Sequence, residues 1–227
     1  FMSFHATIIH AEDAKFNIEE NILYYDTEKN GLNKAYVSYS DISSFRKYLN
    51  ENPNISTIDL NSSGGLAGAG LEIYRVLSDF NVDTVVSRKC SSSCINIFLA
   101  GNLRWLHLGA LLGFHRPDWN AVSMQEYFND FKEEEKWSDS FAFSNWLQGE
   151  TFLIASKIFK NYTDSGVDVS FTADTLKINN DDMWYPTRQE LISAGVVSLI
   201  PIDSNKPLLR PMNLRLSKNK IKLSMVE

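Results

Sequence analysis

Apolar and polar residues follow two different periods along the chain, and the change of period separates predicted strands from predicted helices. Four short runs rich in β-branched and aromatic residues predict strands: residues 6–10, 21–25, 56–60 and 82–87. The last two each lead into a polar loop and then a helical pattern, over residues 68–80 and 95–101. One more apolar run, residues 108–114, follows the second of these helical patterns. This order of elements is typical of a mostly parallel sheet covered by helices.

Helical spacing also marks segments outside this core. Ser40 or Asp41 is expected to cap a short helix that follows the early strands. Residues 123–162 form a long helical stretch in which Ser123 and Glu126 have the spacing of a capping box. The aromatic residues of this stretch are interpreted as core or as a contact between subunits, with a substrate groove as the alternative.

The domain organisation follows from these patterns. Residues 1–200 are predicted to form a single α/β domain that contains the helical insert at about 123–162 and a short helix over residues 187–194. Residues 201–227 are rich in Lys and Arg, show little periodicity, and are predicted to be a C-terminal tail or extension.

Composition narrows the classes of function. The 227 residues are 44% hydrophobic and 22% charged, which is an ordinary globular balance with enough apolar residues for a sizeable core. The formal net charge is -6 and the basic residues form no stripe, so nucleic acid is an unfavourable partner. Two cysteines and four histidines lack the spacing of a zinc site, and we expect neither metal nor cofactor.

Candidate catalytic residues lie at three successive strand ends, where open α/β sheets place their sites. Gly64 and Gly65 follow one strand, a run of serines at residues 91–93 follows the next, and His115 follows the third. A serine there lies beside backbone N–H groups that can stabilise an oxyanion, and His115 can act as its base. Each residue also has a purely structural interpretation: serines before helices are often N-caps, and His115 can simply end a strand.

Three of these segments resemble motifs of the proteolytic subunits of Clp protease. Residues 61–65, Asn-Ser-Ser-Gly-Gly, resemble the family's Asn-Ser-Pro-Gly-Gly loop, with Ser63 in place of the proline. Ser92 followed by Phe-Leu-Ala-Gly at residues 98–101 resembles its nucleophile helix, and Gly-Phe-His-Arg-Pro at residues 113–117 resembles its histidine motif. The ungapped match selects Ser92 among the three serines.

A fourth segment and the cysteines refine the resemblance. Asp-Met-Trp-Tyr at residues 182–185, with Glu190 and Gly-Val-Val at residues 195–197, is similar to the family's aspartate motif. The Cys-x-Ser-x-Cys arrangement around Ser92 most closely resembles the Clp-protease-like predicted periplasmic proteins of bacteria. The resemblance implies a β-β-α superhelix of the Clp-protease/crotonase superfamily, built of repeated βαβ units.

Carried over residue by residue, the resemblance implies a serine peptidase. Ser92 would be the nucleophile, His115 the base and Asp182 the residue that orients the histidine, with the adjoining Asp181 as the alternative. The N–H groups of Gly65 and Ser93 would form the oxyanion hole, and Gly64 would leave the backbone open to substrate. The substrate would be a peptide or protein. We expect hydrolysis without ATP, because no unfoldase-docking loop is recognisable.

Several alternatives stay open. The chain can be a non-catalytic binding or scaffolding protein that keeps the fold, or a crotonase-type acyl-CoA enzyme. Cys90 and Cys94 can form a disulfide around the nucleophile or be buried free thiols, and a cysteine nucleophile is a further alternative. The resemblance further implies a homo-oligomer and a periplasmic or membrane-anchored extracytoplasmic location, with the cytoplasm as the alternative.

Overall fold

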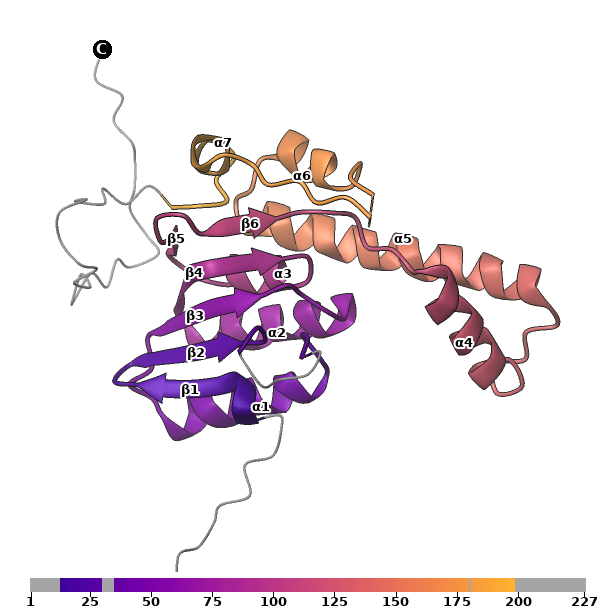
Figure 1. Ribbon diagram of the computed structural model, residues 1–227, viewed down its shortest axis with the longest axis horizontal. Helices are drawn as coiled ribbons and strands as arrows, with labels where there is room; N and C mark the ends of the chain where they lie inside the picture. The colour runs from indigo at the N-terminus through magenta and orange to yellow at the C-terminus, as the bar shows by residue number, and fades with distance from the viewer. Residues whose placement is uncertain (1–12, 30–34, 180, 199–227) are drawn as a thin grey trace, which may run out of the picture.

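The computed structural model describes residues 13–29, 35–179 and 181–198. They form a mixed α/β arrangement with one sheet and several helices, as the sequence pattern predicts (Figure 1). The strand predicted at residues 6–10 and the tail at 201–227 lie outside the described residues. The finer expectation, a superhelix of repeated βαβ units in a single domain, stays a prediction.

The sheet has six strands in the described part of the chain. They are β1 (Phe16–Glu19), β2 (Ile22–Asp26), β3 (Thr57–Ser62), β4 (Asp83–Ser91), β5 (Arg104–Leu106) and β6 (Leu111–Gly113). The order is β1-β2-β3-β4-β5, and only β1 is antiparallel to its neighbour. β6 pairs with the end of β4, beyond the residues that pair with β5.

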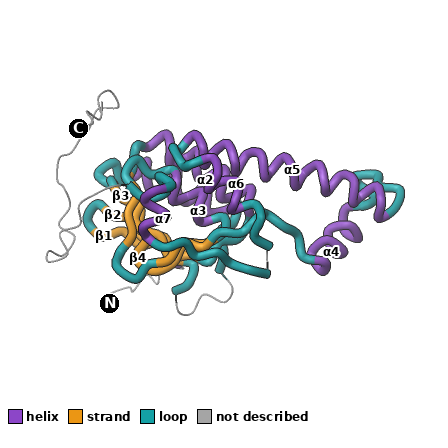
Figure 2. Tube along the Cα trace, turned by 90° about the horizontal axis from the view of Figure 1, so that it is seen from above, coloured by secondary structure: helices purple, strands orange, loops and turns teal. Residues whose placement is uncertain are grey.

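Helices cover one face of this sheet and extend beyond it. They are α1 (Ser40–Glu51), α2 (Ala67–Phe80), α3 (Cys94–Leu99), α4 (Ala121–Phe131), α5 (Ser140–Asp164), α6 (Val169–Thr175) and α7 (Arg188–Ser193). α2 and α3 lie on the same side of the strands in both views (Figures 1 and 2).

The core lies between these helices and the sheet. Ile58 and Leu60 of β3 and Ile73 and Leu77 of α2 are fully buried in one hydrophobic cluster, together with Phe98 of α3. Burying each such side chain contributes about 1.5–3 kcal/mol. This packing fixes the strand ends from which the candidate site is built.

The helical stretch expected over residues 123–162 consists of two helices. α4 and the first part of α5 reach away from the sheet as an arm in both views (Figures 1 and 2), whereas Ile158 and Tyr162 near the end of α5 belong to the core. Aromatic rings pack between them, from Tyr127, Phe128, Trp137, Phe143 and Trp146. No residue of α4 is buried.

Two predicted helix caps are wrong. α4 begins after Asn120, whose side chain accepts a hydrogen bond from the Ser123 N–H, so Ser123 lies inside the helix. Neither Ser40 nor Asp41 caps α1, because the N-cap position is Tyr39 and Asp41 is buried. A capping box is present instead at α7, between Thr187 and Glu190.

Candidate active site

Three strand ends come together at the carboxyl edge of the sheet, as the sequence predicts for parallel strands. The register places Ser62 beside Cys90 and Ser91 beside Gly113. The loops that follow β3, β4 and β6 are therefore neighbours. They carry the glycine pair, the serine run and His115.

Ser92 occupies the sharp turn between β4 and α3. Its φ of 56° is in the left-handed region, which is uncommon for a residue with a side chain. The turn is held by the Ser92 N–H, which donates to the Gly113 carbonyl at 2.9 Å, and by the Ser92 carbonyl, which accepts from Ile95 at 3.0 Å. The half-buried Ser92 is thereby tied to the strand that leads to His115.

The two flanking serines lie in a different environment. Ser91 and Ser93 are only 2% and 3% exposed, and the hydroxyl of each is buried without a hydrogen bond to another described residue. A Cβ on Gly113 would lie 2.5 Å from the Ser91 hydroxyl, and one on Gly70 would lie 3.0 Å from the Ser93 Cβ. Both hydroxyls are therefore enclosed by the protein, and Ser92 is the accessible member of the run.

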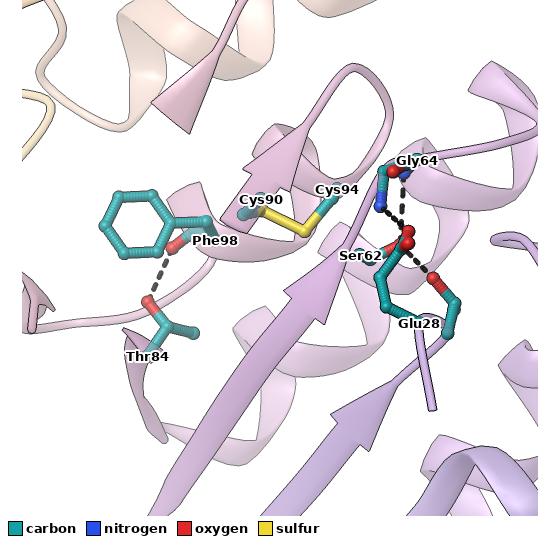
Figure 3. Close-up of a disulfide and its surroundings, with 9 residues drawn as sticks. Glu28, Ser62, Gly64, Thr84, Cys90, Cys94 and Phe98 are labelled. Atoms are coloured by element: carbon teal, nitrogen blue, oxygen red, sulfur yellow. Dashed lines mark hydrogen bonds between the residues drawn. A yellow bond between two sulfur atoms is a disulfide. The ribbon is translucent and has the colours of Figure 1, made fainter. Parts of the chain in front are cut away.

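A disulfide joins Cys90 at the end of β4 to Cys94 at the start of α3, with 5.3 Å between the Cα atoms (Figure 3). Both residues are fully buried. The disulfide closes a loop of five residues with Ser92 at its centre. Because both sulfur atoms are bonded, the described residues contain no free thiol. The structure therefore does not support the alternatives of buried free thiols and of a cysteine nucleophile.

The glycine loop after β3 has three backbone N–H groups in succession, and two of them are occupied. The Ser63 N–H donates to the Glu28 carboxylate at 2.8 Å. The Gly64 N–H donates to the Ser62 hydroxyl at 3.1 Å (Figure 3). The Gly65 N–H donates to no other described residue. The loop therefore keeps one free donor, at the position expected for the oxyanion hole.

The second expected donor is the Ser93 N–H, which likewise has no partner among the residues the structure describes. It lies next to the glycine loop, because a Cβ added to Gly64 would be 3.2 Å from the Ser93 nitrogen. Free backbone donors beside a nucleophile are what an oxyanion hole requires.

His115 follows β6, and its ring orientation is set by its neighbour. Its Nδ1 lies 2.7 Å from the Arg116 carbonyl oxygen. Because a carbonyl can only accept, Nδ1 carries the proton, and in the neutral ring the lone pair is on Nε2. Burial lowers the pKa of His115, partly offset by this hydrogen bond and by the charge of Asp118. The ring is thus mostly neutral at pH 7 and can accept a proton.

The segment that carries the acidic residues lies beside the histidine strand. Phe114 and Trp184 exchange backbone hydrogen bonds of 2.9 and 3.0 Å, and the Arg116 N–H donates to Ile178. Phe114 also packs edge-on against Phe171. These contacts bring the aspartate motif to the edge of the sheet where His115 lies.

The side chains of the proposed triad are not joined by hydrogen bonds in this structure. Across the described ranges, no hydrogen bond links His115 to Ser92 or to Asp182. Asp181 and Asp182 are both exposed, and the Asp182 backbone N–H donates to Asn179 at 3.1 Å. The role of either aspartate stays a prediction.

The residues that hold the glycine loop could not be predicted from the local sequence pattern. Thr27 and Glu28 directly follow β2, and the Thr27 hydroxyl donates to the Ser62 hydroxyl at 2.8 Å. Val37 pairs with the loop from the segment before α1. Only the turn cluster near residues 26–31 could have drawn attention to Glu28, since these contacts join residues about 30 positions apart.

Two broader features of the described residues concern ligands and membranes. No three side chains among their His, Cys, Asp and Glu residues gather in a way that could hold a metal ion. Within the same ranges, no helix combines the length and the apolar character needed to cross a bilayer.

Comparison with known proteins identifies the fold. No family model matches the sequence, and no curated protein matches it. Among solved structures, a point mutant of ClpP1 from Listeria monocytogenes is similar, with a TM-score of 0.51 and 19% identity. The match covers 71% of this chain and 84% of that one. The chain therefore has a ClpP-like fold.

Proposed function

We propose that the protein is a serine hydrolase, and specifically an ATP-independent peptidase with Ser92 as its nucleophile. One observation carries the proposal. The only accessible hydroxyl of the serine run stands in a left-handed turn beside two backbone N–H groups, of Gly65 and Ser93, that donate to no other described residue. The ClpP-like fold makes a hydrolase plausible.

The mechanism we propose is acyl transfer. His115 Nε2 removes the Ser92 hydroxyl proton as the oxygen attacks a peptide or ester carbonyl, and the two N–H groups stabilise the oxyanion. His115 returns the proton to the leaving amine or alcohol. A water molecule, deprotonated by the same nitrogen, then releases the acyl group and restores Ser92.

Asp182 is proposed as the residue that orients His115 when substrate is bound. Support comes from the Phe114–Trp184 pairing, which places residue 182 on the segment next to the histidine strand. In this structure the Arg116 carbonyl already holds the ring in the tautomer that a base needs. Asp182→Asn should therefore lower kcat by less than His115→Ala does.

Labelling with a fluorophosphonate probe tests the nucleophile. We expect wild-type protein to be labelled once per chain, and Ser92→Ala to be unlabelled. Ser91→Ala and Ser93→Ala are matched controls, because each removes a neighbouring hydroxyl that is enclosed in the protein. An unlabelled wild type, or a labelled Ser92→Ala protein, would refute the proposal.

A second candidate is a non-catalytic protein that binds peptides. The observation that favours it is the lack of any Ser92–His115 hydrogen bond in the described structure, together with the exposed carboxylate of Asp182. In that case the probe would not react at any pH, while a peptide library would still be bound. The crotonase-type alternative would be revealed by tight binding of coenzyme A in calorimetry.

We also propose that the protein is a homo-oligomer that uses the arm of α4 and α5. Two phenylalanines of α5 are strongly exposed, Phe141 at 83% and Phe152 at 69%. Burying such rings against a second copy is favourable. Light scattering should give a mass above that of a monomer, and Phe141→Asp with Phe152→Asp should reduce it. A monomeric wild type at micromolar concentration would contradict the proposal.

An extracytoplasmic location, periplasmic or membrane-anchored, is proposed as well. The Cys90–Cys94 disulfide supports it, because such bonds persist in oxidising compartments and are rare in the cytosol. Rapid acid quenching of intact cells, followed by thiol alkylation of the denatured protein and mass spectrometry, should find both cysteines protected from alkylation. Alkylated cysteines under those conditions would favour the cytoplasm.

A further inference from the structure

We propose that Asp41 is a positioning residue of the oxyanion hole, acting through Val37 on the Gly64–Gly65 loop. The inference rests on the proposed hydrolase function for its catalytic consequence. Asp41 itself lies on α1, and within the described residues no hydrogen bond joins its side chain to Ser92, His115 or the glycines.

Asp41 is the centre of a buried polar network. Its side chain is fully buried and accepts four hydrogen bonds. Lys15 donates to its two oxygens at 2.8 and 3.0 Å, the Tyr25 hydroxyl donates at 2.7 Å, and the Ser38 backbone N–H donates at 2.8 Å. A buried carboxylate with this number of partners fixes its surroundings, because its loss would leave the donors from Lys15, Tyr25 and Ser38 without their shared acceptor.

The network holds the short segment around Val37 on both sides. Before Val37, the Tyr36 carbonyl accepts a hydrogen bond from the Lys15 ammonium at 2.8 Å. After Val37, the Ser38 N–H binds Asp41 and its hydroxyl accepts from Lys15 at 3.2 Å. The backbone of Val37 is therefore held by the Lys15 ammonium and the Asp41 carboxylate, which are also paired with each other.

Val37 in turn holds the glycine loop by two backbone hydrogen bonds. Its N–H donates to the Gly64 carbonyl at 2.9 Å, and its carbonyl accepts from the Leu66 N–H at 2.8 Å. These two bonds straddle Gly65, which pairs with Val37 in parallel register. In such a pairing the Gly65 N–H points away from Val37, which is why it stays free for an oxyanion.

The backbones of Val37 and Gly65 are in close contact. A Cβ on Gly65 would lie 2.5 Å from both the nitrogen and the oxygen of Val37. A displacement of Val37 must therefore displace Gly65. Since removal of one oxyanion donor costs about 10²–10³ in kcat, a partial displacement should cost about 10-fold to 100-fold.

The sequence interpretation of Asp41 as a helix cap does not explain this arrangement. A cap would face the first turn of α1 and could be exposed. Instead the carboxylate is directed into the protein, where a lysine 26 residues earlier in the chain and a strand tyrosine meet it. Burial of the Lys15–Asp41 ion pair carries a desolvation cost, which the attraction between the two charges and the further hydrogen bonds of the network offset.

The experiment compares Asp41→Asn and Lys15→Met with Phe45→Leu, a control on the same helix. Phe45 is fully buried against Phe16 and Tyr25, and no hydrogen bond of the described network includes its side chain. Two properties are measured for each protein: kcat and KM for p-nitrophenyl butyrate, and the amide hydrogen-exchange rate of Val37 and Leu66 by NMR.

We expect Asp41→Asn and Lys15→Met each to lower kcat about 10-fold to 100-fold with KM changed less than twofold. The double variant should be no worse than the worse single one. Exchange at Val37 and Leu66 should accelerate at least about 10-fold at matched stability. Phe45→Leu should lower the melting temperature without either effect.

The outcomes separate this inference from the proposed function. Unchanged exchange at Val37 and Leu66, or a kcat no lower than that of Phe45→Leu, would overturn the role of Asp41. If wild-type protein shows no esterase activity and no fluorophosphonate labelling, the proposed function fails. The exchange rates would then still decide whether Asp41 holds the glycine loop.

Discussion

Gly64 lies so close to Ser92 that a Cβ added to the glycine would stand 2.7 Å from the Cβ of the serine. It would also stand 2.6 Å from the Ser91 carbonyl oxygen, and the φ of Gly64 is +101°. The loop at Gly64 and the turn at Ser92 can therefore approach each other only because residue 64 has no side chain.

We predict that Gly64→Ala lowers the rate of fluorophosphonate labelling more than 100-fold and destabilises the protein by about 2–4 kcal/mol. Gly109→Ala is the matched control, because Gly109 has a φ of +79° but nothing within 4 Å of the added Cβ. The control should cost only backbone strain, about 1 kcal/mol, and leave labelling unchanged. Labelling of Gly64→Ala at the wild-type rate would contradict the close approach.

The activity should depend on pH through His115. Burial lowers the pKa of its imidazole, so the protonated, inactive form is disfavoured. We expect kcat/KM to rise with pH to a plateau by pH 7, with a midpoint below 6.5. Asp118→Asn removes the negative charge that raises the pKa and should move the midpoint further down. A midpoint above 6.5, or an upward shift in Asp118→Asn, would be inconsistent with the observed environment.

The disulfide should stabilise the turn around Ser92. A cross-link that closes five residues restricts the unfolded chain by about 2 kcal/mol, which corresponds to a melting temperature higher by about 4–8 °C. The double variant Cys90→Ala/Cys94→Ala should melt lower by that amount and not respond to reductant. Wild-type protein that alkylation shows to be fully reduced should have the melting temperature of the variant. Equal melting temperatures of the oxidised and reduced wild-type protein would argue against the prediction.

Arg104 should stabilise the contact of β5 with the ends of three helices, α3, α5 and α7. Its guanidinium donates to four backbone carbonyls at 2.8–3.3 Å, from Leu99, Ser165, Gly195 and Val196. Arg104→Met should lower the free energy of unfolding in urea by about 2–4 kcal/mol, because four carbonyls lose a charged donor.

Arg75→Met provides the comparison for Arg104. Arg75 is exposed and pairs with Glu72 at 3.0 Å within one helix turn. Its replacement should cost less than about 0.5 kcal/mol. Equal losses for the two variants would show that the carbonyl contacts of Arg104 do not stabilise the fold.

The order of strands and helices in the central part of the chain could be predicted from the sequence, because local periodicity encodes it. Residues 56–60 and 82–87 are strands, although β4 continues to Ser91. This extension follows a shift of register against β3 between Leu60 and Ser62, which depends on the neighbouring strand. β5 was missed, since three residues carry too little pattern to be recognised.

The features of the candidate site also divide into those that the sequence predicts and those that only the structure shows. The sequence by itself determined which chemical groups stand at three strand ends, because parallel strands bring their carboxyl ends to one edge. Only the tertiary structure decided that Ser92 is the accessible serine and that Gly65 keeps a free N–H. It also showed Asp41 buried against Lys15. These properties depend on contacts between residues far apart in the chain, which no local pattern records.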